Sequence, residues 1–467
     1  MPESAPKRRR YPKAGAAVSA AADARPAKWV RTARTNLRRR MARSPIAFAM
    51  SGGGSQGSFE TGVLRFLYDD LGLRPTILCG SSVGSIIAAK LAEGDDPATG
   101  RRAIDETEAI WRGLRSNDDM WLAEPWLEKL RSQANWAAEL RGRAAENGTA
   151  GSQARVVLRM LSEVVRHPPE TDGTLDALRQ AMRARSLLSM EPVRRLVEAN
   201  IDPDRIAASG MLLRIGAVGL ESGELRYVTE HGEVQTRDGD PLDQPRVPLT
   251  EAVLASASIP LVFPPTKLND EHYVDGGVRE ILPLELAFNR LGAGHIFAVV
   301  ASTPGIERIP DVGDKGLLEL ARRVTADIVP DETLRKEISP PRGWGKRVTV
   351  IAPELDVHDA LTVDRTLIDA SIDYGYMRAA DVLLSLGPEQ AAISTRIAAL
   401  RMEIRALDGP ITGPFTPLPE GPLPTPDEVE RELRQAHKEL DELIDQRREA
   451  GAPLPPGECS TKPALNP

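Results

Sequence analysis

A serine set among glycines is the first group in this 467-residue chain that could do chemistry. The run Gly80-Ser81-Ser82-Val83-Gly84 has the glycine-x-serine-x-glycine spacing of a nucleophile elbow, a sharp strand-to-helix turn that exposes the serine Oγ. Gly80 and Gly84 suit this turn because Cβ atoms at their positions would collide. The pattern predicts Ser82 as a nucleophile for acyl transfer, with an ordinary strand-to-helix turn as the alternative.

A second glycine-rich run, Gly52-Gly53-Gly54-Ser55-Gln56-Gly57, precedes the serine. Consecutive glycines can turn several backbone N–H groups towards one anion. A nucleotide-binding P-loop would need lysine directly after the last glycine, but Ser58 and Phe59 stand there. The run therefore favours an oxyanion hole, in which each N–H donor is typically worth about 10²–10³ in turnover.

A serine nucleophile needs a base, and two kinds are open. His272, His295 and His358 follow Ser82 in the chain and could complete a triad, although none of them sits in a distinctive motif. Asp275 is followed by Gly276 and Gly277, which let backbone and ligand approach its carboxylate closely. A carboxylate can take the hydroxyl proton directly, so that serine and aspartate form a catalytic dyad without imidazole.

The elements around these motifs alternate between strand and helix. The periodicity predicts buried strands at 46–50 and 76–79, each followed by a glycine-rich turn and a helix, at 58–71 and 86–92. Further strands are expected at 212–218, 225–229, 295–301 and 347–352, a helix at 282–291, and mainly helix over 101–205. This order indicates an α/β architecture with a largely parallel sheet.

Taken together and in this order, the three motifs make the chain similar to the patatin-like phospholipases. Further support comes from the stretches Ala255-Ser256-Ala257-Ser258-Ile259-Pro260 and Phe263-Pro264-Pro265, which look like the family's approach to its aspartate. The resemblance covers residues 45–385 and implies a three-layer fold with a mostly parallel central sheet flanked by helices, a helical insertion at about 101–205 and a C-terminal helical extension. It implies Ser82 as nucleophile and Asp275 as general base. It also implies oxyanion donors among Gly52, Gly53, Gly54 and Ser55.

Two positions depart from the family's pattern. The family commonly has arginine or lysine where Gln56 stands, and asparagine before proline where this chain has Ile281 before Leu282-Pro283. Both departures leave the backbone donors in place and bear on substrate preference. Four of the six tryptophans, at 111, 121, 126 and 136, fall in the helical insertion, which is a candidate acyl-binding lid; separate burial of the indoles is the alternative.

Composition and charge narrow the class of protein. Hydrophobic residues make up 41% of the chain, and no uncharged apolar run approaches the roughly 18 residues of a membrane span. Two cysteines, Cys79 and Cys459, provide no disulfide framework, and no Cys/His cluster has metal-ligand spacing, so no metal and no cofactor is expected. These features suggest a cytoplasmic protein.

The N-terminal arm, residues 1–44, carries a charge opposite to that of the rest of the chain. It holds 13 Lys and Arg against two acids, a charge of +11, so the net charge of −7 leaves −18 for the remainder. An acidic body argues against specific nucleic-acid binding. We expect the arm to be disordered; contact with anionic lipid, at the inner face of a membrane, is the alternative.

The C-terminal region divides into four segments. We expect a helix at 386–409, a linker at 410–427, an amphipathic helix at 428–450 and a flexible tail at 451–467; seven prolines among the 17 residues from 410 to 426 favour an extended spacer. The second helix has an apolar stripe at Val429, Leu433, Ala436, Leu440 and Leu443. This stripe predicts either a helix that folds back on its own body or self-association.

The expected function is hydrolysis of phospholipid or lysophospholipid acyl esters by a Ser82–Asp275 dyad, through an acyl-enzyme. Two alternatives remain at this stage. One is an esterase or thioesterase that uses a Ser-His-Asp triad. The other is a catalytically silent membrane-tethering or assembly protein that uses the basic arm and the terminal helices.

Overall fold

The computed structural model describes residues 30–32, 35, 44–126, 184–260, 262–306, 308, 324, 328–339, 344–409, 411 and 425–456. Most of the basic arm, the centre of the predicted helical insertion with Trp136, most of the proline-rich linker and the end of the tail lie outside these residues. The domain boundaries given above therefore stay predictions.

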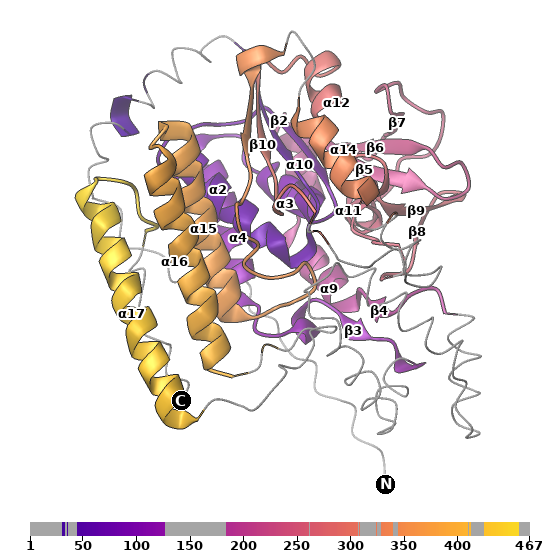
Figure 1. Ribbon diagram of the computed structural model, residues 1–467. Helices are drawn as coiled ribbons and strands as arrows, with labels where there is room; N and C mark the ends of the chain where they lie inside the picture. The colour runs from indigo at the N-terminus through magenta and orange to yellow at the C-terminus, as the bar shows by residue number, and fades with distance from the viewer. Residues whose placement is uncertain are drawn as a thin grey trace, which may run out of the picture.

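Strands and helices alternate through the first half of the described chain and helices dominate its end (Figure 1). The strands are β1 (Ile46–Met50), β2 (Ile77–Ser81), β3 (Leu122–Ala123), β4 (Leu188–Ser189), β5 (Leu212–Gly219), β6 (Leu225–Thr229), β7 (Val234–Thr236), β8 (Thr266–Leu268), β9 (Glu271–Asp275), β10 (His295–Val299) and β11 (Val348–Ile351). The helices are α2 (Gly57–Asp69), α3 (Val83–Leu91), α4 (Pro97–Gly113), α9 (Glu191–Asn200), α10 (Pro203–Ala208), α11 (Leu249–Ser256), α12 (Leu284–Asn289), α14 (Val329–Ile338), α15 (Arg365–Leu384), α16 (Pro388–Leu407) and α17 (Pro426–Glu449), with short 3₁₀ turns at η1 (Gly54–Gln56), η2 (Asn117–Asp119), η3 (Gly276–Val278) and η6 (Gly345–Arg347).

The main sheet runs in the order β11-β10-β1-β2-β5-β6-β7. The first five of these strands are parallel to one another, which confirms the predicted α/β class, and β6, β7, β8 and β9 extend the sheet with antiparallel pairs. The six predicted strands are confirmed as β1, β2, β5, β6, β10 and β11, with ends that differ by a few residues.

Side chains of the central strands alternate between two cores, as the pleat of a strand requires. Phe48 and Met50 of β1 face the core formed with α2, α3, α4 and α15, whereas Ala47 and Ala49 face a second core with α12 and α14. Helices therefore cover both faces of the sheet, and the predicted three-layer arrangement is confirmed. Both cores are needed to bury the sheet, because a parallel sheet presents no solvent-tolerant face.

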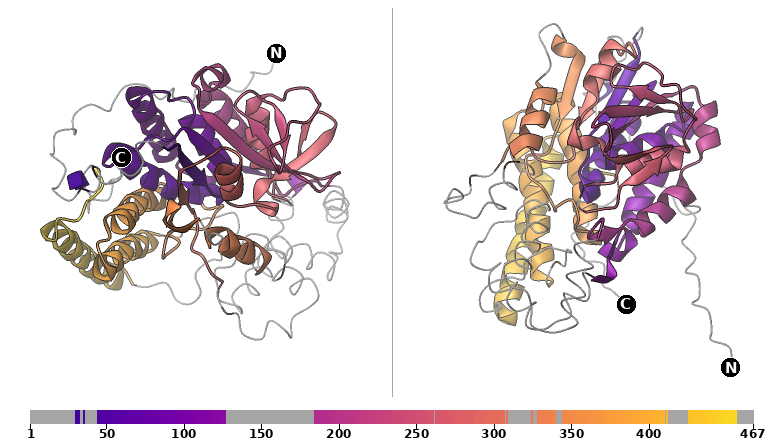
Figure 2. Two further views of the ribbon diagram at one scale, coloured as in Figure 1. Left: turned by 90° about the horizontal axis from the view of Figure 1, so that it is seen from above. Right: turned by 90° about the vertical axis from the view of Figure 1, so that its right-hand side faces the viewer.

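The C-terminal helices add a further layer outside α15. Ile393, Ile397 and Leu400 of α16 pack with Ala436 and Leu440 of α17 in a separate apolar cluster. This layer lies at the opposite end of the molecule from β6 and β7 (Figures 1 and 2). Ala436 and Leu440 of the apolar stripe of α17 are thus buried within the chain itself, which favours the fold-back alternative, whereas Val429, Leu433 and Leu443 are half-buried. Self-association stays a prediction.

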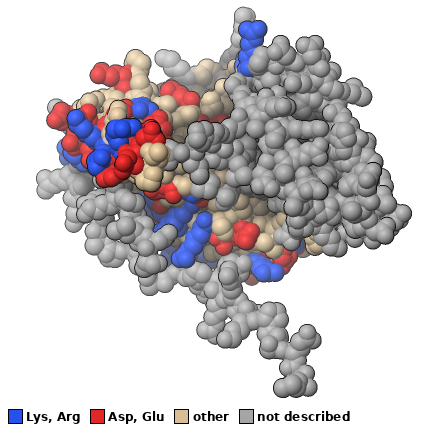
Figure 3. Space-filling model, turned by 60° about the horizontal axis from the view of Figure 1, so that its bottom comes forward, with Lys and Arg blue, Asp and Glu red and all other residues tan. Residues whose placement is uncertain are grey.

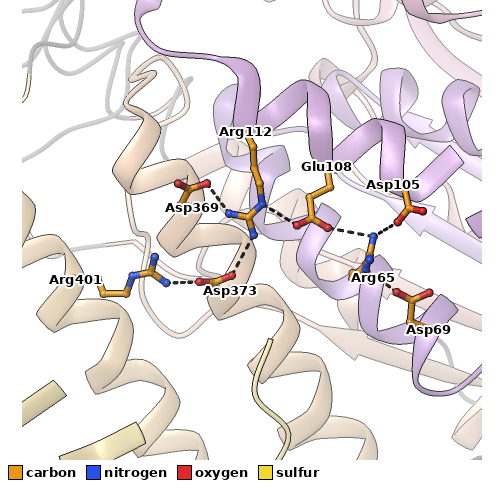
Figure 4. A network of polar contacts seen from close by, with 8 residues as sticks. All are labelled: Arg65, Asp69, Asp105, Glu108, Arg112, Asp369, Asp373 and Arg401. Atoms are coloured by element: carbon orange, nitrogen blue, oxygen red, sulfur yellow. Dashed lines mark hydrogen bonds and ion pairs between the residues drawn. The ribbon is translucent and has the colours of Figure 1, made fainter. Parts of the chain in front are cut away.

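A network of charged side chains joins four helices beside the first core (Figure 4). Arg112 of α4 pairs with Glu108 on its own helix and with Asp369 and Asp373 of α15. The network continues through Arg65 of α2 to Asp69, Asp105 and Glu108, and through Arg401 of α16 to Asp373. It links the helix that follows the glycine-rich run to the C-terminal layer.

The surface of the described residues carries both signs of charge. On the face drawn in Figure 3, acidic and basic side chains are intermixed where described residues form the surface. None of the helices in the described ranges has the length and hydropathy needed to cross a bilayer. A grouping of His, Cys, Asp and Glu side chains suited to a metal ion is likewise absent from the described residues.

Candidate active site

Ser82 stands at the turn between β2 and α3, as the elbow motif predicts. Its backbone has φ 55° and ψ −133°, a conformation that non-glycine residues rarely adopt. A Cβ on Gly80 would lie 2.4 Å from the carbonyl oxygen of Gly84, and one on Gly84 would lie 2.4 Å from that of Ser51. Both positions therefore need glycine, and the following helix directs the positive end of its dipole at this turn.

The register of the sheet brings Asp275 to Ser82. Strand β2 ends with Ser81 opposite Gly216 of β5, and β9 ends with Asp275 opposite the next residue, Ala217. Because β6 pairs with the other edge of β5, β2 and β9 share one edge, and their ends meet there. A Cβ on Gly276 would lie 2.9 Å from the Ser81 Oγ, so the two turns are in contact.

The carboxylate of Asp275 is buried and held by specific donors. The pKa of Asp275 is raised to about 6, chiefly because burial disfavours the charged form, while a side-chain hydrogen bond with Ser82 and one from the Gly277 amide lower it. The Gly277 N–H lies 2.8 Å from Oδ1, and the Asp275 N–H donates to the Ser258 carbonyl at 2.9 Å. The Ser82 hydroxyl therefore lies near enough to the Asp275 carboxylate to lower its pKa, as expected of a candidate base and its alcohol.

The glycine-rich run lies against the same turn. A Cβ on Gly52 would lie 2.8 Å from the Ser82 Cβ and 3.4 Å from the Ser82 Oγ. No hydrogen bond among the described residues uses the N–H of Gly52, Gly53 or Gly54. These three amides are thus the candidates for an oxyanion hole.

The prediction that Ser55 adds an oxyanion donor is corrected by the structure. Its N–H donates to the carbonyl oxygen of Ala360 at 2.8 Å, so this amide is already occupied. Its side chain also points to that segment, because Ser55 Oγ donates to the Asp359 carbonyl at 2.9 Å. Gln56 has a similar part, since its Nε2 donates to the His358 carbonyl at 3.0 Å.

The three histidines proposed for a triad have other partners. His272 pairs with Glu221 at the surface, and His295 Nε2 lies 3.0 Å from Thr349 Oγ1. His358 is buried and contacts the hydroxyl groups of Ser55 and Ser58. Burial lowers the pKa of His358 below its usual range, although nearby aspartates act in the opposite direction. Asp275 is thus the candidate base beside Ser82, and none of the three histidines has a hydrogen bond to Ser82 among those of the described residues.

Ser256 is a site residue whose role sequence reasoning missed. Its Oγ accepts the Ser82 N–H at 3.0 Å and donates to the Gly216 carbonyl at 2.6 Å, so it ties the elbow to β5. The residue lies in the Ala255–Pro260 stretch that supported the family resemblance, but the sequence did not indicate that its hydroxyl would reach the nucleophile.

Two carboxylates with raised pKa values, the buried Glu280 and the half-buried Glu337, lie behind the site and were also missed. Glu280 accepts a hydrogen bond from the Tyr227 hydroxyl, and burial raises its pKa to about 7. Glu337 of α14 accepts the N–H groups of Ile281 and Leu282, and burial raises its pKa to about 8. The departure from the family's pattern at Ile281 therefore falls where α14 attaches to the chain after Asp275.

The tryptophans of the predicted insertion are buried separately where the structure describes them. Trp111 packs beside Gly57 and Val83, directly behind the elbow, and the Trp121 ring lies 6.2 Å from that of Phe263. Trp126 is also buried. This supports separate burial for these three indoles, while the lid stays a prediction.

Comparison of the sequence with models of known families shows which family the chain belongs to. A family model described as patatin-like phospholipase matches residues 48–288, just over half of the chain, and the match includes both Ser82 and Asp275. The chain belongs to the patatin-like phospholipases. Membership of this family supports a lipid hydrolase activity. The curated proteins compared with this sequence include no match.

Several solved structures resemble this patatin-like chain at low sequence identity. VipD from Legionella pneumophila is 14% identical, with 87% of this chain and 77% of VipD covered and a TM-score of 0.35. Human GIVD cytosolic phospholipase A2 is 14% identical, with 62% of this chain and only 51% of the human protein covered and a TM-score of 0.27. A chain of the ExoU–SpcU complex from the type III secretion system of Pseudomonas aeruginosa is 14% identical, with 87% of this chain and 78% of that chain covered and a TM-score of 0.22.

Proposed function

We propose that this chain hydrolyses lipid acyl esters by a Ser82–Asp275 dyad. The observation that carries the proposal is that the ends of β2 and β9 bring Ser82 and the buried Asp275 together beside the glycine-rich run. A carboxylate in this position can accept the hydroxyl proton as Oγ attacks the ester carbonyl carbon. The raised pKa makes Asp275 a stronger base than an ordinary aspartate once it is ionised.

The reaction divides into two half-reactions. In the first, Oγ bonds to the carbonyl carbon, the negative oxygen is stabilised by amides of Gly52, Gly53 and Gly54, and the alcohol leaves with the proton from Asp275. In the second, water attacks the acyl-enzyme, Asp275 takes a proton from this water, and the fatty acid leaves as Ser82 recovers its proton. Each amide donor is expected to contribute about 10²–10³ in rate.

The substrate class is phospholipid or lysophospholipid, and the support for it is family membership. The triad alternative lacks an equivalent observation, because His272, His295 and His358 are hydrogen-bonded elsewhere. The alternative of a catalytically silent tethering protein predicts that Ser82 does not react, whereas the enzyme requires that it does.

The proposal is tested with a panel of phospholipid and lysophospholipid vesicles and short-chain esters. Ser82→Ala and Asp275→Asn should each lower ester hydrolysis by several orders of magnitude. Ser81→Ala is the matched control, since the Ser81 Oγ donates to the Glu280 carbonyl at 3.0 Å, and it should lower turnover less than about tenfold. Turnover retained in Ser82→Ala, or lost equally in Ser81→Ala, would contradict the dyad.

We also propose that the enzyme works as a peripheral protein at an anionic membrane face, with residues 1–44 as the contact. The support is the +11 charge of that segment, where each basic side chain near an anionic bilayer contributes about 1 kcal/mol. Deletion of residues 1–44 should reduce co-sedimentation with anionic vesicles and leave hydrolysis of a soluble ester unchanged. Equal sedimentation of both forms would contradict the contact.

A further inference from the structure

The segment after β11 closes over the glycine-rich run from more than three hundred positions away. Gly54 has φ 56°, and a Cβ there would lie 2.1 Å from the carbonyl oxygen of Ala360. The N–H of Ser55 donates to the same oxygen at 2.8 Å, and the Gln56 side chain donates to the His358 carbonyl at 3.0 Å. The conformation of the run is therefore fixed by contacts outside it.

His358 is the side chain at the centre of these contacts. Its Nε2 lies 3.2 Å from Ser58 Oγ, and its Nδ1 lies 3.3 Å from Ser55 Oγ and 3.0 Å from the Asp359 carbonyl. A carbonyl oxygen can only accept, so Nδ1 carries the proton in that contact. Ser58 Oγ donates to the Ser55 carbonyl oxygen at 3.0 Å and lies in hydrogen-bond contact with Nε2, so this hydroxyl joins the ring to the run, and the imidazole spans both serines that flank Gln56 and Gly57.

The segment that carries His358 is itself anchored on both sides. Asp356 accepts the N–H and the hydroxyl of Thr303 at 2.8 and 2.9 Å. The N–H of Val363 donates to Asn117 Oδ1 at 2.8 Å, and Asp364 caps the start of α15. Because these contacts fix the segment that carries His358, the hydrogen bonds of its ring can in turn fix the position of the glycine-rich run.

We infer that His358 is a positioning residue for the oxyanion donors, acting through Ser55 and Ser58. It does not touch the reacting atoms; it holds the run so that Gly52 stays against Ser82 and the Gly53 and Gly54 amides keep their direction. The inference rests on the proposed function. The charged groups that face the ring are the carboxylates of Asp356, Asp359 and Asp364, and its other neighbours, Ser55, Gln56 and Ser58, do not titrate near neutral pH.

The test compares His358→Leu, which keeps much of the bulk without hydrogen bonds, with His358→Gln, whose amide can still bond to Ser58. The expected result for His358→Leu is a fall in kcat of about tenfold or more on a soluble short-chain ester, with KM within about twofold of the wild type. His358→Gln should recover part of this loss. His295→Asn is the matched control, because it alters another buried histidine, bonded to Thr349, and should change neither constant.

A double-mutant cycle tests the route through Ser58. Ser58→Ala should lower kcat in the wild-type background and have a clearly smaller effect in the His358→Leu background, because there the contact with His358 is already lost and Ser58→Ala removes only the bond to the Ser55 carbonyl. Independent effects that multiply would overturn the proposed route.

Amide hydrogen exchange measures the same positioning without any turnover. In His358→Leu, amides of residues 51–58 should exchange about tenfold faster, while those of β10 stay as in the wild type. A kcat within twofold of the wild type, or unchanged exchange in this run, overturns the inference. If the wild type hydrolyses no ester, the proposed function fails and exchange still decides the role of His358; if His358→Leu does not fold, His358→Gln and Ser58→Ala decide it.

Discussion

In the proposed dyad, Asp275 is buried beside Ser82 and has to be charged to take the Ser82 proton. These demands conflict, because burial disfavours a carboxylate. The chain resolves the conflict in part with two hydrogen bonds, from Ser82 and from the Gly277 amide, and the pKa stays raised at about 6. Activity and stability should therefore respond to pH in opposite directions at this residue.

We expect kcat/KM for a soluble ester to rise with pH and level off above about pH 6. The reason is that only the ionised form of Asp275 can accept the Ser82 proton, and its pKa lies near 6. A pH–rate profile between pH 4 and 8 on an ester of constant charge checks this. A profile that is flat across pH 6, or that falls as pH rises, would argue against Asp275 as the base.

Asp275→Asn should stabilise the fold at pH 8 while it abolishes activity. The folded pKa of about 6 exceeds the ordinary value of 3.8, so the stability associated with protonated Asp275 is full below about pH 4 and is lost as pH rises through 6. Roughly two pKa units correspond to about 3 kcal/mol. Urea unfolding at pH 8 and pH 4 should show a gain for the variant at pH 8 that shrinks at pH 4; an equal difference at both would contradict the account.

At the scale of the elements, the site depends on how closely α15 packs on α2. A Cβ on Gly62 of α2 would lie 1.8 Å from the Ile372 carbonyl oxygen, and one on Gly375 of α15 would lie 2.1 Å from that of Phe59. The backbones of the two helices are thus in direct contact. The glycine-rich run opens α2 and the His358 segment precedes α15, so this packing helps to bring the two segments together.

Gly62→Ala should lower the free energy of unfolding by several kcal/mol, because the added methyl meets backbone that cannot move without separating the helices. Gly113→Ala, at the last residue of α4, is the matched control: a Cβ there has nothing within 4 Å, and the change should be neutral or slightly stabilising. Denaturant unfolding of both variants checks the contrast. Equal effects would show that the contact is not limiting.

Short sequence motifs were enough to predict the turns of the site. Contacts between residues far apart in the chain could not be predicted from such motifs. Gly80 and Gly84 mark the elbow because strain within five residues demands glycine there. Ser55 was wrongly expected to donate to the oxyanion because its amide partner, Ala360, lies far along the chain. His358 stands in no motif, so only the fold reveals its contacts.

At the scale of the whole molecule, a buried ion pair attaches the C-terminal layer of α16 and α17 to α15. Arg447 of α17 pairs with Asp381 of α15 at 2.9 Å, and both side chains are inaccessible, at 0% and 1% exposure. Arg447 also donates to Ser394 of α16 at 2.7 Å, so one side chain joins three helices. Such a pair specifies how the layer seats on the body, because either partner left alone is a buried charge.

Arg447→Met should lower the free energy of unfolding by about 3 kcal/mol or more, since it leaves Asp381 without its cation. Arg434→Met is the control; its ion pair with Glu430 is exposed and contributes at most about 1 kcal/mol. Adding Asp381→Leu to Arg447→Met should recover part of the loss. If the two arginine variants unfold alike, the buried pair does not hold the layer.

The periodicity of the sequence could predict the helices α16 and α17 but not the elements against which they pack. The apolar stripe of α17 fitted both fold-back and self-association, because a stripe records that one face is covered and not by what. No prediction was made for α15, which is buried on most of its surface and so lacks a one-sided apolar pattern. The antiparallel strands β7, β8 and β9 were also not predicted, although β9 carries Asp275 to its place.

The central claim is that Ser82 becomes covalently acylated with Asp275 as its base, and labelling by a fluorophosphonate tests it most directly. Peptide mass spectrometry should find a single adduct on Ser82 in the wild type, none in Ser82→Ala, and labelling slowed at least about a hundredfold in Asp275→Asn. An adduct on another residue, or equal labelling of the wild type and Asp275→Asn, would contradict the account.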